Sequence, residues 1–107
     1  MLWIRRFNGT GNYYDFATSL GLSEDNNQLY VTGLSVGTGS GEDYASLAYD
    51  VPTGTRLWMH RYNGPGNDND DANAVSVSPD GSVVVVTGTS LKSGHDWDYA
   101  TVAYSAR

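Results

Sequence analysis

Closely spaced carboxylates are the residues of this chain best suited to binding an ion. Residues 67–71 read Asn-Asp-Asn-Asp-Asp, and two further aspartates flank Trp97. Hard cations such as calcium prefer carboxylate and amide oxygens, although these stretches lack the central glycine and the final glutamate of an EF-hand loop. The sequence therefore predicts a cation site, with calcium as the candidate ion, formed by Asp68, Asp70, Asp71, Asp96 and Asp98.

Four of the acidic residues also have a structural explanation, because they recur. Asp15 and Asp43 return 55 residues later as Asp70 and Asp98. An aspartate at a turn accepts hydrogen bonds from backbone N–H groups, and we expect this role for all four. The stronger cation candidates are the three that do not recur: Asp68, Asp71 and Asp96.

Aromatic rings in loops are the second group with binding chemistry, because sugars stack on the faces of Trp and Tyr. Tyr13, Tyr14 and Trp97 lie in predicted loops and would be the ligand residues of a carbohydrate-binding protein. A lectin with one sugar site per repeat would repeat its stacking residue, but Tyr13-Tyr14 aligns with Asp68-Asn69. A lectin is therefore the alternative interpretation.

Composition argues against several other function classes. The absence of cysteine excludes disulfides, zinc-thiolate sites and cysteine nucleophiles. His60 is expected in a strand and His95 in a loop, where a histidine is more often a surface or edge residue than a catalyst. The net charge of -6 with only six Lys and Arg argues against nucleic acid, and no apolar run is long enough to cross a membrane. Catalysis is not expected.

The N-terminal residues do not resemble a secretion signal, because no apolar core followed by small residues is present. If the parent protein is exported, its signal lies outside this chain. The sequence leaves the compartment open, since exported proteins need not carry disulfides.

These residues are carried by a duplicated unit. Over 52 pairs aligned at a period of 55, from Met1 with Arg56 to Pro52 with Arg107, 21 are identical. The two repeats span residues 1–55 and 56–107. A period of this size, built from short β-like runs, indicates a solenoid or a propeller in which one unit cannot bury its own faces.

Each repeat contains four β-like runs separated by Gly, Asn, Asp and Pro. We name them a to d, from the axis of a propeller to its rim, so that the order along the chain is d-a-b-c twice. The continuous valines at 83–86 predict a strand covered on both faces. The expected fold is all-β, with four-stranded antiparallel sheets. The runs are 2–7, 16–22, 28–35 and 44–49, then 56–62, 72–77, 83–90 and 99–104.

Residues 48–58, Ala-Tyr-Asp-Val-Pro-Thr-Gly-Thr-Arg-Leu-Trp, follow the pattern A-x-D-x-x-T-G-x-x-x-W. This pattern resembles the tryptophan-docking motif of quinoprotein-type β-propellers. The segments Asp-Asp-Ala at 70–72, Ser-Pro-Asp-Gly at 78–81 and Val-Thr-Gly at 86–88 are similar to bacterial propeller repeats of the SBBP type. The resemblance implies interblade docking by four residues: Trp3, Trp58, Ala48 and Gly54.

The resemblance implies a fold more than an activity. Members of this family include quinone-dependent dehydrogenases and inert scaffolds, and fold does not determine function. The quinone site of the enzymes relies on a vicinal disulfide, which a chain without cysteine cannot form. No cofactor is therefore expected apart from calcium.

Two blades span too little of a circle to close, since propellers need roughly 4 to 8 blades. We therefore expect other copies of the chain to close the ring, with Leu2 to Phe7 of one copy pairing beside Tyr99 to Tyr104 of the next. The expected function is a non-catalytic scaffold or binding module that assembles head to tail, as a tetramer with eight blades. The alternatives are a trimer with six blades, a lectin, and a piece of a longer or engineered repeat array.

Overall fold

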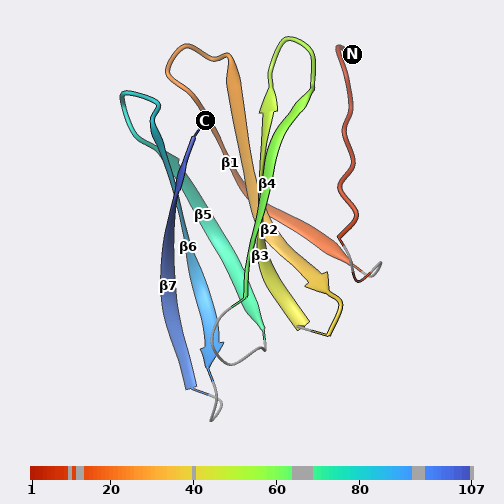
Figure 1. Cartoon of the computed structure of the whole chain (residues 1–107), viewed down its shortest axis with the longest axis vertical. Helices are drawn as coiled ribbons and strands as arrows, with labels where there is room; N and C mark the ends of the chain where they lie inside the picture. Colours follow the sequence, from red (N-terminus) through yellow and green to blue (C-terminus); the bar gives the residue numbers. More distant parts are fainter. Residues whose placement is uncertain (10, 12–13, 40, 64–68, 93–95, 107) are drawn as a thin grey trace.

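The computed structural model describes residues 1–9, 11, 14–39, 41–63, 69–92 and 96–106. The described residues form seven strands (Figure 1): β1 (Asp15–Leu22), β2 (Gln28–Gly37), β3 (Gly41–Asp50), β4 (Arg56–Tyr62), β5 (Asp70–Val77), β6 (Val83–Lys92) and β7 (Asp96–Ser105). None of these residues belongs to a helix that is long and apolar enough to cross a membrane.

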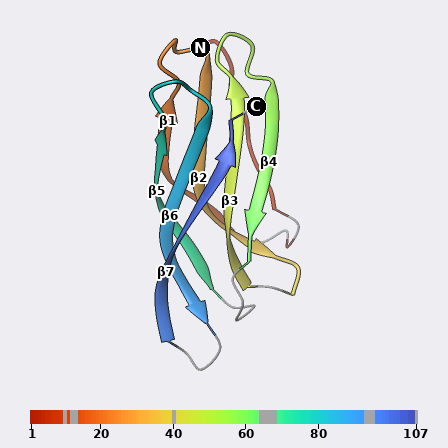
Figure 2. The ribbon, with the colours of Figure 1, turned by 60° about the vertical axis from the view of Figure 1, so that its left-hand side comes forward.

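The strands make two antiparallel sheets, neither of which closes on itself. Sheet 1 has the order β1-β2-β3-β4, and sheet 2 has the order β5-β6-β7. The sheets stack against each other, with β5 in contact with β1, β2 and β3 (Figure 2). The predicted all-β class and antiparallel sheets are confirmed, and seven of the eight predicted runs are strands.

The eighth predicted strand, residues 2–7, does not form within the single chain. Residues 1–9 belong to no strand. They run down one side of sheet 1, from the N-terminus toward the end of the molecule where β1 begins (Figure 1). An extended segment becomes a strand only when a neighbouring edge accepts its backbone hydrogen bonds, and none of the described strands pairs with this one.

The turns that join β1 to β2 and β5 to β6 are built alike. Asp25 accepts the N–H of Asn27, and Asp80 accepts the N–H of Ser82, each at 3.0 Å. Hydrogen bonds from the hydroxyls of Ser82 and Ser78, together with the bond from the Ser82 N–H, lower the pKa of Asp80 to about 2. Both turns need one residue with positive φ, which Asn and Gly tolerate best. That residue is Asn26 in the first turn, with φ 61°, and Gly81 in the second, with φ 73°.

A bulge lies near the start of β1 and near the start of β5, and it explains the glycine of the recurring Thr-Gly. The pairing of β1 with β2 shifts between Ala17 and Ser19, and that of β5 with β6 shifts between Ala72 and Ala74. At these points the chains approach so closely that a Cβ on Gly33 would lie 1.9 Å from the Phe16 carbonyl oxygen. A Cβ on Gly88 would lie 2.1 Å from the Asp71 carbonyl oxygen, so glycine is required at both places.

The core lies between the two sheets. Sheet 1 contributes Tyr30, Tyr44 and Ala48, while sheet 2 contributes Ala72 and the alternate valines 84 and 86. The valine run is therefore fully buried on one face only, because Val83 and Val85 on the opposite face are half-buried. The prediction of a strand covered on both faces is wrong in this respect, since no described element packs on the outer face of sheet 2.

Candidate functional site

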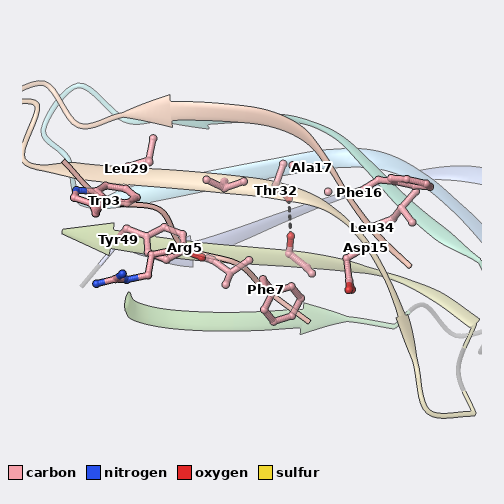
Figure 3. Close-up of a pocket in the computed structure, with 14 residues that line it drawn as sticks. Trp3, Arg5, Phe7, Asp15, Phe16, Ala17, Leu29, Thr32, Leu34 and Tyr49 are labelled. Atoms are coloured by element: carbon pink, nitrogen blue, oxygen red, sulfur yellow. Dashed lines mark hydrogen bonds between the residues drawn. The ribbon is translucent and has the colours of Figure 1, made fainter. Parts of the chain in front are cut away.

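On the face of sheet 1 that points away from sheet 2, Leu47 and Tyr49 of β3 are buried, whereas the apolar residues of β1 have little cover. Leu20 and Leu22 on β1 are 65% and 48% exposed. Beside them lies a pocket of about 260 Å³, which Leu29 and Leu47 line from the sheet. The N-terminal segment lines part of the same pocket (Figure 3), with residues that include Trp3, Arg5 and Phe7.

The corresponding face of sheet 2 is covered. Positions 17, 29 and 31 of sheet 1 correspond to Ala72, Val84 and Val86 of sheet 2 in the duplicated sequence. These three residues are completely buried against sheet 1. The same face is thus fully packed in sheet 2, whereas in sheet 1 it is open on the side of β1.

The N-terminal segment is held on sheet 1 by the indole of Trp3. Its Nε1 donates to the carbonyl oxygen of Val51 at 2.7 Å, and Arg5 Nε donates to the carbonyl oxygen of Gly54 at 2.7 Å. Gly54 has φ 75°, and a Cβ there would lie 2.7 Å from the Trp3 ring. A residue larger than glycine at position 54 would therefore displace the indole.

Trp58 repeats this contact between the sheets. Its Nε1 donates to the carbonyl oxygen of Ala106 at 3.1 Å, and this bond spans 48 residues, as does the bond of Trp3. Trp58 lies 6.0 Å from the ring of Tyr104, and Trp3 lies 6.0 Å from the ring of Tyr49. Residues 1–9 therefore lie against sheet 1 much as β4 lies against sheet 2.

The four residues predicted to dock blades thus fall into two pairs. Gly54 contacts Trp3, whereas Ala48 lies opposite Trp58 on the neighbouring strand of the same sheet. The contacts of Trp3 are made within its own chain, while the sequence predicts that it acts across the junction between chains. Both roles are compatible only if the segment that carries Trp3 also touches another copy.

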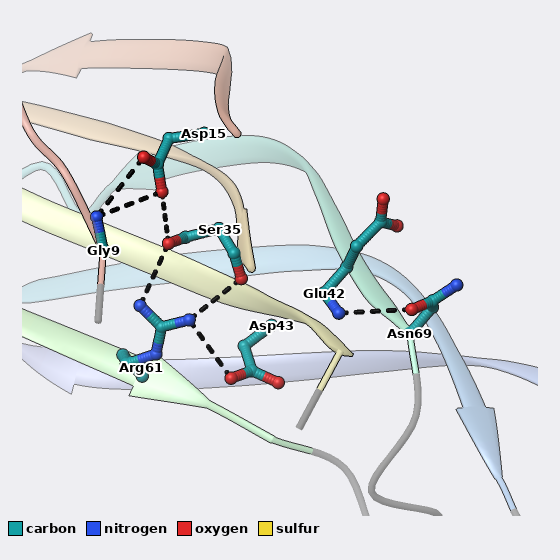
Figure 4. A network of polar contacts seen from close by, with 7 residues as sticks. All are labelled: Gly9, Asp15, Ser35, Glu42, Asp43, Arg61 and Asn69. Atoms are coloured by element: carbon teal, nitrogen blue, oxygen red, sulfur yellow. Dashed lines mark hydrogen bonds and ion pairs between the residues drawn. The ribbon is translucent and has the colours of Figure 1, made fainter. Parts of the chain in front are cut away.

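A polar cluster joins four elements at the end of sheet 1 (Figure 4). Arg61 on β4 forms an ion pair with Asp43 at 3.2 Å and donates to the Ser35 hydroxyl at 3.0 Å and to its carbonyl oxygen at 2.9 Å. The Ser35 hydroxyl donates to Asp15, and both oxygens of Asp15 accept the N–H of Gly9 at 3.3 Å. Asp15 has the turn role expected for it.

The described strands of sheet 2 repeat Asp15, Ser35 and Asp43 as Asp70, Ser90 and Asp98. Asp70 is completely buried and accepts the Ser90 hydroxyl at 2.5 Å, as Asp15 accepts Ser35. Asp98 lies opposite Ser90 in the register of β6 and β7, as Asp43 lies opposite Ser35. Asp43 is buried under Arg61, whereas Asp98 is exposed.

The structure describes only part of the predicted cation-ligand set. Asp70 is engaged by Ser90, and Asp98 lies on the other side of that serine in the sheet. Asp96 begins β7, and Asp68 lies outside the described residues. Among the side chains that are described, no three acidic or histidine groups come together as a metal site. Calcium binding therefore stays a prediction.

Asp71 has a different environment from the other acidic residues. Burial raises its pKa to about 6, and a hydrogen bond with Glu42 and the negative charges of Glu42 and Asp70 act in the same direction. Its Oδ1 is buried and has no hydrogen-bond partner among the described atoms. The neutral form of this carboxyl group therefore persists to a higher pH, about 6, than that of an ordinary aspartic acid.

Two of the three predicted sugar-binding aromatics, Tyr14 and Trp97, are among the described residues. The Tyr14 ring stacks on Phe16 with the centroids 5.3 Å apart, and its hydroxyl donates to Glu42 at 2.5 Å. Trp97 on β7 is 54% exposed. Tyr13 lies outside the described residues, as does His95. His60 stacks on Tyr104 with the ring centroids 4.7 Å apart, which is a packing contact.

Sequence reasoning missed the cluster around Arg61. A signal was present, because Arg6, Ser35 and Asp43 all recur without change in the second repeat. Comparison with protein-family models, with curated proteins and with solved structures finds no match to this chain.

Proposed function

We propose that this chain is a two-blade β-propeller unit that assembles head to tail with further copies into a closed ring and serves as a non-catalytic scaffold or binding module. One observation carries the proposal: the duplicated sheets bury opposite faces. Sheet 2 covers its face against sheet 1, while sheet 1 leaves the corresponding face open around Leu20 and Leu22. A monomer with such a face exposes apolar surface that an assembly would cover.

A second copy has the right residues to cover it. The residues of sheet 1 that cover sheet 2 include Tyr44 and Ala48, and their counterparts on the outer face of sheet 2 are Tyr99 and Ala103. Both counterparts are exposed, Tyr99 by 87%. The outer face of sheet 2 in one copy therefore matches the open face of sheet 1 in the next copy. This contact is heterologous, and it generates a closed ring when the rotation from one copy to the next is a whole fraction of a full turn.

Four copies with eight blades are the preferred ring, because the docking motif resembles that of eight-bladed quinoprotein-type propellers. Three copies with six blades are the alternative. The contacts of Asp70 and His60 are consistent with the scaffold role, since the first residue bonds Ser90 and the second stacks on Tyr104. A ring of this kind presents its loops as a binding surface.

Native mass is the test of the ring. Size-exclusion chromatography with light scattering should give about four times the chain mass of 11.6 kDa, and deletion of residues 1–7 should abolish the assembly. Leu20→Asp places a charge on the open face and should have the same effect. Asn27→Asp, in the exposed turn before β2, is the matched control and should assemble normally. A chain that stays monomeric at every accessible concentration would refute the proposal.

A carbohydrate-binding function is the second candidate, and the exposed ring of Trp97 favours it. Tyr14 is also exposed at the strand ends where Trp97 lies, although it stacks on Phe16. A glycan array separates the two functions. Binding that is lost in Trp97→Ala would support the lectin, whereas an array without signal would leave the scaffold as the function.

A further inference from the structure

The described strands of sheet 2 repeat Asp15, Ser35 and Asp43 of the sheet 1 cluster as Asp70, Ser90 and Asp98, but none of these strands carries the arginine. We propose that Arg6 of a second copy of this chain supplies it, pairing with Asp98 and Ser90 and so fixing the register in which residues 2–7 add to the outer edge of β7. This inference rests on the proposed ring and assigns the residues that make its junction specific.

The cluster in sheet 1 shows the contacts that Arg6 would make. Arg61 forms an ion pair with Asp43 at 3.2 Å and bonds both oxygens of Ser35, at 3.0 and 2.9 Å. One guanidinium thus holds a side chain from β3 and a backbone carbonyl from β2. Arginine suits this place because its planar fork donates to several acceptors at once.

Each partner has a counterpart in sheet 2. Ser90 corresponds to Ser35, Asp98 to Asp43, and Arg6 to Arg61. The Ser90 hydroxyl donates to Asp70, as Ser35 donates to Asp15, so the serine oxygen is oriented to accept a bond as it does in sheet 1. Arg6 is exposed in the single chain, as is Asp98.

The backbone of sheet 1 gives the register. β4 pairs with β3 through Ala45 opposite Arg61, Tyr44 opposite Tyr62 and Ala48 opposite Trp58. Transferred to the junction, Arg6 lies opposite the next copy's Ala100 and Phe7 opposite its Tyr99, while Trp3 lies opposite its Ala103. None of the described strands of the same chain pairs with this edge of β7.

The second copy is the occupant because its N-terminal segment already has the matching orientation. Trp3 is held on sheet 1 by the bond to Val51, as Trp58 is held on sheet 2 by the bond to Ala106. β4 makes that indole contact and simultaneously pairs with β3. Residues 2–7 make the indole contact with their own chain, so their backbone edge is in place for the β7 of another copy.

A charged pair is needed at this edge because the apolar residues alone would permit slipped pairings. A shift by two residues keeps the same side chains on each face of the strand, and only specific pairs penalise it. Such a shift would remove Arg6 from Asp98 and leave both charges without their partner. The ion pair therefore selects one register among those that pack similarly.

Charge reversal tests the pair directly. Arg6→Asp places two aspartates at each junction, and Asp98→Arg places two arginines there, so each variant alone should assemble at least tenfold more weakly than the original chain. The double variant Arg6→Asp with Asp98→Arg restores opposite charges and should assemble again. An equimolar mixture of the two single variants should also assemble, by alternation, when the ring contains an even number of copies.

Two controls keep the outcome specific. Arg56→Asp changes an exposed arginine on β4 that is not part of the cluster, and it should neither weaken assembly nor rescue Asp98→Arg in a mixture. Unfolding curves at low concentration should show that each variant folds as the original chain does.

The results separate this inference from the ring itself. If the original chain is monomeric, the proposed function fails. If the original chain forms a ring and Arg6→Asp forms it with equal affinity, the ring stands and the pairing of Arg6 with Asp98 is refuted. A double variant no better than either single variant would refute the pairing in the same way.

Discussion

Strands β3 and β7 carry nearly the same residues but have opposite surroundings. Both contain Asp-Tyr-Ala followed four residues later by Tyr, at 43–45 and 49 and at 98–100 and 104. Every residue of β3 from Asp43 to Tyr49 is buried, because β2 and β4 flank the strand, sheet 2 covers one of its faces and the N-terminal segment lies over the other. On β7, Tyr99 is 87% exposed. Burial is thus a property of the neighbours that a strand has, and the difference marks where a neighbour is missing.

The most direct test of this comparison is to truncate the equivalent tyrosine in each strand. Tyr44 is completely buried and donates to the Ala100 carbonyl oxygen at 2.9 Å, so Tyr44→Ala should cost about 3 to 5 kcal/mol of the free energy of unfolding. Tyr99→Ala should leave the unfolding of the single chain almost unchanged and weaken assembly instead. Urea unfolding at low concentration, together with native mass, measures both. Equal losses of unfolding free energy would contradict the comparison.

The two docking tryptophans extend the comparison to the ends of each sheet. Trp58 links the sheets, and Trp58→Ala should cost about 3 kcal/mol at any concentration. Trp3 anchors only the N-terminal segment, so Trp3→Ala should cost about 1.5 kcal/mol in the single chain, with a further loss that grows where the chain assembles. Trp97→Ala is the control and should be nearly neutral. Melting temperatures measured at several protein concentrations test the difference between the two tryptophans. Equal losses of stability in Trp58→Ala and Trp3→Ala that do not depend on concentration would contradict it.

Two glycines with the same backbone conformation test the Trp3 contact. Gly54 and Gly81 have φ of 75° and 73°, but only at Gly54 would a Cβ meet a side chain, 2.7 Å from the Trp3 ring. Gly81→Ala should cost about 1 kcal/mol through backbone strain alone. Gly54→Ala should cost more and should shift the indole N–H resonance of Trp3, as followed by NMR. An unchanged indole resonance would show that the segment is not held there.

The raised pKa of Asp71 predicts how the stability of the fold changes with pH. Because the pKa of Asp71 is raised to about 6 in the folded chain, the folded state binds more protons than the unfolded state between about pH 4 and 6. This contribution to stability is present below the unfolded pKa and is lost as the pH rises through 6. Asp71→Asn should raise the melting temperature at pH 7 and flatten the slope between pH 4 and 6. If the melting temperature of the variant still changed as steeply between pH 4 and 6, the pH dependence would belong to another titratable group.

The smallest effect is expected from calcium. If the loops around Asp68, Asp71 and Asp96 hold the ion, calcium should raise the melting temperature more than sodium does at equal ionic strength. The variant Asp68→Asn with Asp71→Asn should remove that difference. Equal stabilisation by the two salts would show that these residues do not bind calcium.

The repeat predicted much of the fold because its signals are local. The Asp and Gly of the turns at 23–27 and 78–82, and the Thr-Gly beside each bulge, reflect backbone geometry that any copy of the unit must adopt. The capping role of Asp15 was predicted for the same reason. The strand at residues 2–7 was predicted from the same pattern, but it needs a partner edge, which no local signal supplies.

By itself, the sequence determined the all-β class, the number of repeats and the places of the turns, since periodicity and turn chemistry act over a few residues. Only the tertiary structure decided which copy of each face is covered, where Trp3 docks, and that Arg61 joins Asp43 to Ser35. Identical residues such as Tyr44 and Tyr99 cannot be told apart by their own chemistry. Their environments differ because packing depends on what lies beside a strand, and a strand's neighbours come from distant parts of the chain.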